Sequence, residues 1–134
     1  MAPFRHPLRV RFHECDPQGV VFNGNYLAYF DIAFTELWRD GFGGWDAAMS
    51  EHGLDAVVAE ANVRFLAPLG FDEEIEVVAT VTNLGETSMT TGFAVERGAE
   101  TVAAGELRHV FVDAEGRAKA PIPDDIRAGL RRFT

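Results

Sequence analysis

Residues 15–26 read Cys-Asp-Pro-Gln-Gly-Val-Val-Phe-Asn-Gly-Asn-Tyr, and this stretch decides the fold of the chain. Before it, apolar and polar side chains alternate from Leu8 to His13, which predicts a strand over residues 5–14. After it, apolar residues recur at helical spacing, which predicts a long helix over residues 24–40. The stretch is therefore the loop that joins a first strand to a long helix.

Asp16 lies in this loop, between Cys15 and the turn-forming residues Pro17 and Gly19. The loop ends at the N-terminus of the predicted helix, where backbone N–H groups are free and carry partial positive charge. A carboxylate beside N–H donors that stabilise anions is an arrangement suited to acyl transfer. Asp16 is for this reason the first candidate for a reacting group.

The rest of the chain changes from helical to strand-like patterns. A short second helix is expected at Trp45 to His52, and a terminal helix at 124–133. Breaks rich in glycine, proline and asparagine separate four predicted strands, at 55–66, 73–84, 87–97 and 101–113.

The order of one strand, one long helix and then four strands predicts an α+β domain spanning residues 1–134. The helix carries an apolar stripe, so we expect a five-stranded antiparallel sheet, in meander-like succession, curled around it. One helix cannot cover both faces of such a sheet. We therefore expect an open edge or face to pair with another subunit. The stripe consists of Leu27, Phe30, Phe34, Leu37 and Trp38.

Composition narrows the function classes. The net charge of −9 argues against a general nucleic-acid binder, and 11 phenylalanines supply bulky side chains for a core or an acyl pocket. A single cysteine excludes an intramolecular disulfide, as in a reducing compartment. Neither a transmembrane span nor a signal-peptide segment is recognisable, so we expect a cytoplasmic protein that does not act at a membrane.

The chain resembles the 4-hydroxybenzoyl-CoA thioesterase family of hot-dog proteins over about residues 6–133. The last strand and the Pro121-Ile122-Pro123 tail are similar too. The motifs that carry the resemblance are Val10-x-Phe12, Asp16-Pro17-x-Gly19-Val20-Val21-x-x-x-Asn25-Tyr26, Phe30-Asp31-x-Ala33 and Val63-Arg64-Phe65-x-x-Pro68-Leu69.

The resemblance implies a hot-dog fold, a homodimer or homotetramer, and hydrolysis of acyl-CoA to a carboxylic acid and free CoA. It implies that Asp16 is the catalytic carboxylate and that the backbone N–H of Asn23 points at the thioester carbonyl. Many bacterial acyl-CoA thioesterases of this family have histidine at that position. The asparagine here retains the backbone role but not an imidazole role.

Two chemical roles for Asp16 stay open beside its plain role as a turn-former. It is either a nucleophile that forms a mixed anhydride or a general base that activates water. The Asn23–Gly24 N–H region is assigned to the oxyanion, and Gly24 would let a thioester approach the backbone closely. Asn23 is also a candidate helix N-cap.

Several neighbours are candidate substrate-binding residues, each with a structural alternative. Gly19 fits a loop, and Phe22 lines either the acyl pocket or the core. Asn25 and Tyr26 lie in the motif, although bracing of the helix or a subunit interface explains them as well. By resemblance to the 4-hydroxybenzoyl-CoA enzyme, Asp31 would contact a ring hydroxyl of the substrate. A surface acid on a helix is the ordinary alternative for Asp31.

Binding the phosphates of CoA requires cations, for which we select Arg64, Arg108 and Arg117. A Cys15–His13 nucleophile is discounted because a single cysteine is more often a small buried hydrophobic residue. The G-x-S-x-G elbow, zinc-ligand spacings and nucleotide-binding glycine motifs are absent from the sequence. We therefore expect no metal or redox cofactor.

Three competing functions stay open. A hydratase on the same fold would require a histidine in the site loop. A non-catalytic acyl-thioester binding protein would have no use for a carboxylate at the carbonyl. A thioesterase that acts on acyl carrier protein would use the same residues as one that acts on CoA.

Overall fold

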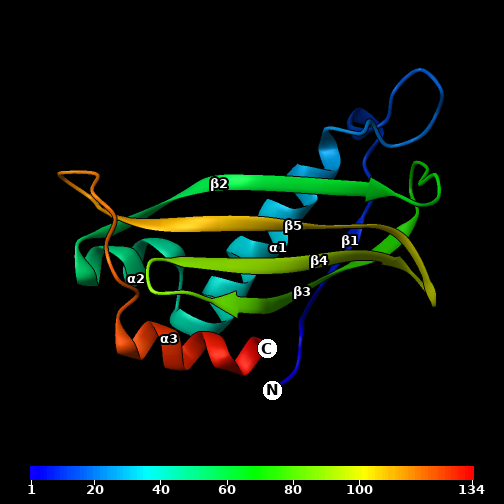
Figure 1. Ribbon diagram of the computed structural model, residues 1–134. Helices are drawn as coiled ribbons and strands as arrows, with labels where there is room; N and C mark the ends of the chain where they lie inside the picture. Colours follow the sequence, from blue (N-terminus) through cyan, green and yellow to red (C-terminus); the bar gives the residue numbers. More distant parts are fainter.

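The computed structural model describes residues 1–134 and contains one sheet, whose strands lie in the order β1-β3-β4-β5-β2 (Figure 1). All neighbouring strands are antiparallel. The strands are β1 (Phe4–Arg9), β2 (Leu54–Phe65), β3 (Glu74–Leu84), β4 (Ser88–Arg97) and β5 (Glu100–Asp113). The helices are α1 (Asn25–Phe42), α2 (Trp45–His52) and α3 (Asp124–Leu130), with short 3₁₀ helices at Phe12–Glu14 and Arg131–Phe133.

The long helix α1 crosses one face of the sheet, and the two chain termini lie close together below it (Figure 1). This α+β architecture confirms the prediction of a five-stranded antiparallel sheet around one long helix. None of the helices combines the length and the apolar character needed to cross a bilayer.

The core forms where α1 packs on the sheet. The Phe30 ring stacks on that of Phe93 on β4, with centroids 4.7 Å apart. Gly105 on β5 permits this close approach, because a Cβ there would overlap the carbonyl of Asn62 and press on the Phe30 ring. Burial of this apolar face is the main driving force that holds the helix in the sheet.

Two of the predicted details are wrong. Leu27 is 37% exposed, because Tyr26 and Tyr29 fill the core positions at that end of α1. The four later strands do not follow one another in a simple meander, since β2 pairs with β5 at the far edge. Only β3, β4 and β5 form consecutive hairpins.

The first strand is shorter than predicted, and this shapes the site. β1 ends at Arg9 because its partner β3 begins only at Glu74. The last contacts between the two segments are the N–H of Val10 to the carbonyl of Glu73, and the N–H of Asp72 back to Val10, both at 3.0 Å. Without a partner strand, the chain then turns through the 3₁₀ helix.

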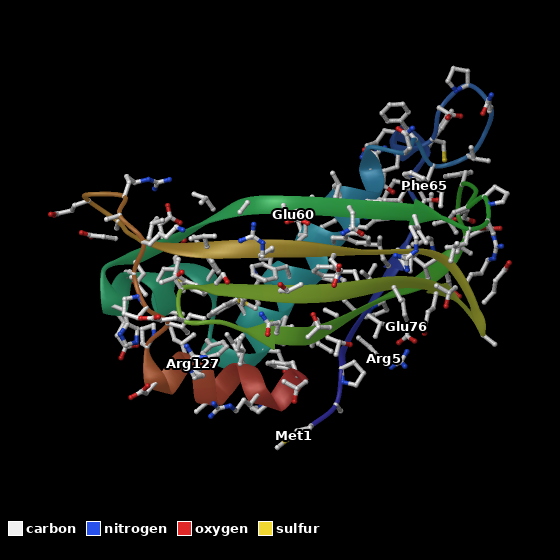
Figure 2. The ribbon with its side chains drawn as sticks, in the orientation of Figure 1. Met1, Arg5, Glu60, Phe65, Glu76 and Arg127 are labelled. Atoms are coloured by element: carbon white, nitrogen blue, oxygen red, sulfur yellow. The ribbon has the colours of Figure 1, made fainter.

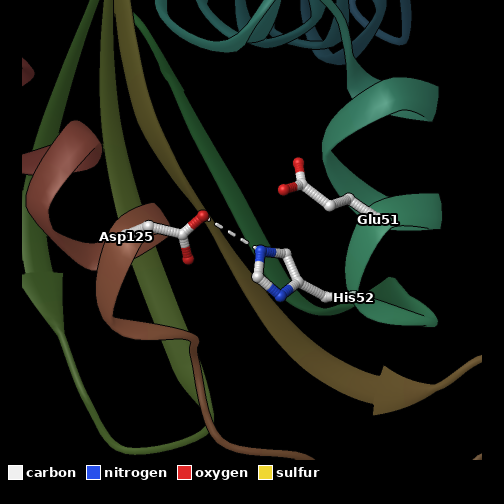
Figure 3. A group of neighbouring side chains, drawn as sticks. All are labelled: Glu51, His52 and Asp125. Atoms are coloured by element: carbon white, nitrogen blue, oxygen red, sulfur yellow. Dashed lines mark hydrogen bonds and ion pairs between the residues drawn. The ribbon is translucent and has the colours of Figure 1, made fainter.

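At the opposite end of the sheet, α3 packs beside α2. His52 at the end of α2 contacts Asp125 at the start of α3, with Nε2 and Oδ2 3.1 Å apart, and Glu51 lies nearby (Figure 3). The possible ligand atoms of these three side chains lie within 4.8 Å of one another, which is close enough to hold a metal ion. They lie on the surface, and the contact joins the terminal helix to the rest of the fold.

Candidate active site

The Asp16 loop projects beyond the end of β2, as the blue loop at the upper right of Figure 1. It begins with a tight turn, in which the N–H of Gly19 donates to the carbonyl of Asp16 at 2.9 Å. Aspartate first and proline second are the residues that such a turn prefers. Gly19 has φ +80°, a left-handed conformation that glycine adopts without strain. The expected loop role of Gly19 is confirmed.

The turn also orients the Asp16 carboxylate. Its Oδ1 accepts the backbone N–H of Gln18 at 2.8 Å, and the N–H of Asp16 donates to the carbonyl of Val20 at 2.8 Å. The side chain is half-buried, and its Oδ2 has no partner within the chain. One oxygen is thus held in place while the other is free to react.

The start of α1 leaves two donors unused. The N–H groups of Phe22, Asn25 and Tyr26 donate to carbonyls of the chain, whereas those of Asn23 and Gly24 donate to none. Gly24 is the N-cap and no side chain caps the helix, so the alternative of an Asn23 side-chain cap is wrong. The Asn23 backbone does take part in the first turn, because its carbonyl accepts the Tyr26 N–H at 3.3 Å.

A cavity of about 440 Å³ joins these groups. It is bounded by the Asp16 loop, the start of α1 and the end of β2, where Phe65 lies beside the loop (Figure 2). The lining residues are Asp16, Gln18, Val20, Val21, Phe22, Asn23, Tyr26, Phe65, Leu66, Ala67 and Pro68. Asp16 and Asn23 therefore line the same cavity.

A second groove, of about 600 Å³, lies on the other side of Asp16. Its walls are the exposed rings of Phe12 and Phe71, whose centroids are 5.7 Å apart, together with Cys15 and Pro17. Asp16 is the only ionisable carboxylate that lines both spaces.

Known proteins are similar to this chain in sequence and in fold. A family model described as the thioesterase-like superfamily matches residues 10–130. The chain belongs to this superfamily. The acyl-CoA thioester hydrolase YbgC of Escherichia coli is 33% identical over 86 residues, which are 64% of this chain and 63% of that protein.

Two further relatives match nearly the whole length of this chain. A 1,4-dihydroxy-2-naphthoyl-CoA hydrolase of Thermosynechococcus vestitus is 26% identical over 123 residues, which cover 91% of this chain and 84% of that one. The crystal structure of an Aquifex aeolicus protein matches with a TM-score of 0.89 and 29% identity, covering 96% of this chain and 99% of that one. The predicted membership in a hot-dog family of acyl-CoA thioesterases is confirmed.

The other predicted residues of this thioesterase differ in their distance from Asp16. Phe22 is largely exposed in the cavity rather than in the core, while Tyr26 is buried and its ring packs on Phe65 at 5.3 Å. Asn25 is a brace, because its Nδ2 donates to the backbone carbonyl of Glu14 at 2.8 Å. Asp31 lies on α1 but lines neither space around Asp16.

The three selected arginines are not brought together. Arg64 is exposed near the end of β2 and forms no ion pair, but it lines a separate groove of the sheet with Ala94 and Ala104 rather than the spaces around Asp16. Arg108 pairs with Glu60 at 3.5 Å in the middle of the sheet. Arg117 pairs with Asp55 at 3.0 Å in the turn after β5, at the opposite end of β2 from Phe65.

The sequence reasoning missed Glu14 and Phe65 as parts of the site. Glu14 falls at the end of the predicted strand, whereas the structure places it in a 3₁₀ helix. The alternating pattern therefore gave no signal for its contacts with α1. Phe65 belonged to a strand predicted some forty residues later. Only strand pairing brings the end of β2 to the Asp16 loop.

Proposed function

We propose that this protein hydrolyses an acyl-CoA thioester with Asp16 as the reacting carboxylate. The observation that carries the proposal is the cavity lined by both Asp16 and Asn23, whose backbone N–H is unpaired. A thioester carbonyl in this cavity would accept that N–H, with the neighbouring N–H of Gly24 as a second donor. Donors of this kind stabilise the negative charge that develops on the carbonyl oxygen.

The reaction proceeds by one of two routes from this geometry. As a nucleophile, the free Oδ2 of Asp16 bonds to the carbonyl carbon, CoA leaves as its thiolate, and water hydrolyses the resulting anhydride. As a general base, Asp16 takes a proton from water while the water oxygen bonds to the carbonyl carbon. Both routes give a carboxylic acid and free CoA, and neither requires a metal or redox cofactor.

The two routes differ in where a label goes. A single turnover in H₂¹⁸O, with enzyme in excess, places ¹⁸O in the product when water attacks the thioester directly. Label recovered in the peptide that contains Asp16 identifies the nucleophilic route, because water has then attacked the Asp16 carbonyl of the anhydride. Mass spectrometry of product and peptide reads both positions in one experiment.

The proposed function is tested by thiol release from a panel of acyl-CoAs, with short and long aliphatic, benzoyl, phenylacetyl and hydroxybenzoyl members. Hydrolysis that disappears in Asp16→Asn supports the proposal. Undiminished hydrolysis by Asp16→Asn would refute it. Hydrolysis of acyl-acyl carrier protein but not of acyl-CoA would identify the carrier protein as the substrate's carrier. Binding of acyl-CoA without hydrolysis would indicate the non-catalytic alternative.

A hydroxyaryl acyl group is the substrate class proposed first. The relative from Thermosynechococcus vestitus is named for a dihydroxynaphthoyl thioester, and Asp31 matches a position with a ring-hydroxyl role in the resembled enzyme. Partial desolvation of Asp31 on the α1 surface raises the pKa of its carboxyl. Because Asp31 lines neither space around Asp16 within one chain, this contact requires a second subunit at the site. Asp31→Ala should lower kcat/KM for hydroxybenzoyl-CoA but not for benzoyl-CoA. An unchanged kcat/KM for hydroxybenzoyl-CoA in Asp31→Ala would eliminate this role.

Arg64 is proposed to contact the CoA phosphates, because it is the selected cation that forms no ion pair and it directly precedes Phe65, which lines the cavity. Arg108 and Arg117 remain candidates only if a second subunit brings them to the site. Arg64→Gln should raise KM for acyl-CoA while leaving kcat nearly unchanged. Arg131→Gln, at an exposed arginine of the C-terminal 3₁₀ helix that forms no ion pair, is the matched control.

A homodimer or homotetramer is proposed from the outer edge of β2. This edge strand has 12 residues and carries the exposed side chains of Val57 and Val58. Long apolar edges are usually covered by another chain. Light scattering during size-exclusion chromatography should give at least twice the mass of one chain. The cytoplasmic location stays a prediction from the sequence.

A further inference from the structure

We propose that Glu14 is a positioning residue that fixes the Asp16 carboxylate relative to the N–H groups at the start of α1. This inference rests on the proposed function, because it concerns the geometry of the same site. Glu14 ends the 3₁₀ helix, two residues before Asp16. Its backbone and its side chain each bind the segment that begins α1.

The backbone carbonyl of Glu14 makes the first connection. It accepts the N–H of Phe22 at 3.0 Å and the side-chain Nδ2 of Asn25 at 2.8 Å. These two donors flank Asn23 and Gly24, whose own N–H groups are unpaired. One carbonyl therefore holds both sides of the proposed oxyanion site.

The carboxylate of Glu14 makes the second connection. Its Oε1 accepts the hydroxyl of Tyr29 at 2.8 Å and the backbone N–H of Arg11 at 2.8 Å. Tyr29 lies on α1 and is 1% exposed, in the hydrophobic core. Arg11 lies just before the Asp16 loop. The same oxygen therefore joins a rigid helix to the loop that carries the reacting carboxylate.

The degree of burial makes this link stiff. The Glu14 side chain is only 12% exposed, so its charge depends on these donors. Burial, together with the hydrogen bond to Glu14, raises the pKa of the Tyr29 hydroxyl, which stays protonated and able to donate. By contrast, the contact between Arg11 Nη1 and Oε2, at 3.3 Å, lies on the exposed side.

A displaced carboxylate costs rate rather than binding, because proximity and orientation act on the reacting atoms. Tyr29→Phe removes one hydroxyl and leaves the ring in the core. We expect it to lower kcat about tenfold, since small misplacements have effects of this order, with KM within about twofold. Glu14→Ala should lower kcat by more than Tyr29→Phe does.

Two variants serve as matched controls. Glu14→Gln retains an amide oxygen that accepts both the Tyr29 hydroxyl and the Arg11 N–H, so kcat should stay within about threefold of the parent. Arg11→Ala removes only the exposed contact and should leave kcat unchanged. A double-mutant cycle of Glu14→Ala and Tyr29→Phe should be non-additive in kcat, because both changes break the same bond.

The experiment measures kcat and KM for the best acyl-CoA at a temperature well below each variant's melting transition, determined by circular dichroism. A kcat for Tyr29→Phe and Glu14→Ala within twofold of the parent overturns the inference, provided that Asp16→Asn is inactive. Should Glu14→Ala fail to fold, Tyr29→Phe and Glu14→Gln decide alone. Activity that persists in Asp16→Asn refutes the proposed function instead, so the two failures are distinguishable.

Discussion

The Asp16 loop and the middle of the core both contain polar groups without a partner, and the two regions use them differently. In the loop, these are the Oδ2 of Asp16 and the N–H groups of Asn23 and Gly24, which border an open cavity. In the core, they are the Nε1 of Trp38, the Oγ1 of Thr91 and the Nδ1 of His109.

The difference lies in what can reach each group. A substrate or water can occupy the cavity, so the loop groups are available for chemistry at little cost to folding. The core groups are shielded, and His109 stacks flat on Phe34 with centroids 4.1 Å apart. A buried polar group without a partner lowers stability. Changes in the loop should therefore affect rate, and changes in the core should affect unfolding.

The largest effect on rate is expected for Asp16→Asn. An asparagine Oδ1 can still accept the Gln18 N–H, so the turn should persist while the charge and the reacting oxygen are lost. We expect kcat to fall by about 10²- to 10⁴-fold, the contribution typical of an acid–base group. Thiol release gives kcat, and urea unfolding should show an unchanged midpoint. Glu115→Gln, in the exposed turn after β5 where the side chain forms no ion pair, is a control for charge alone.

The second largest effect on rate is expected at Gly24, where two substitutions distinguish loss of the backbone N–H from the effect of an added carbon. Gly24 has φ −63°, which proline accepts, and Gly24→Pro removes the N–H. Gly24→Ala keeps the N–H but introduces the same Cβ, which would lie 3.1 Å from the Phe22 ring. We expect kcat to fall by about 10²-fold or more in Gly24→Pro and far less in Gly24→Ala. Equal losses would mean that the added carbon, rather than the lost donor, is responsible.

In the core, the largest expected effect is a loss of stability in acid. Burial lowers the pKa of His109 from 6.5 to about 4, so the folded protein keeps it neutral where the unfolded chain is already protonated. Its contribution is present above pH 6.5 and is lost as the pH falls towards 4, by about 3 kcal/mol. Urea unfolding between pH 7.5 and 4.5 should show this slope, and His109→Leu should flatten it. An unchanged slope in His109→Leu would assign acid sensitivity to other groups.

The smallest effect is expected at Thr91, which is fully buried and whose hydroxyl is unpaired. Thr91→Val replaces the hydroxyl by a methyl group of similar size. We expect the free energy of unfolding to rise by about 1 kcal/mol with kcat unchanged. Urea unfolding at pH 7 measures the first and thiol release the second. A loss of stability would indicate that the hydroxyl has a partner, such as a bound water.

Local patterns were sufficient for much of the fold. The helix of α1, the short helix at Trp45 and the strands from β3 to β5 follow from periodicity and from glycine and proline breaks. The Asp16 turn was also predictable, because aspartate, proline and glycine at these offsets favour one backbone shape. Such features depend on residues a few positions apart, which the sequence displays directly.

The sequence by itself thus determined the α+β class, the Asp16 turn and its place before a long helix. Only the tertiary structure decided that β1 stops at Arg9, that β2 lies at the sheet edge and that Phe65 borders the cavity. It also decided that Glu14 reaches Tyr29, and that Arg117 lies far from Asp16 within one chain. The physical reason is that strand partners and side-chain contacts join residues distant along the chain, which no local pattern encodes.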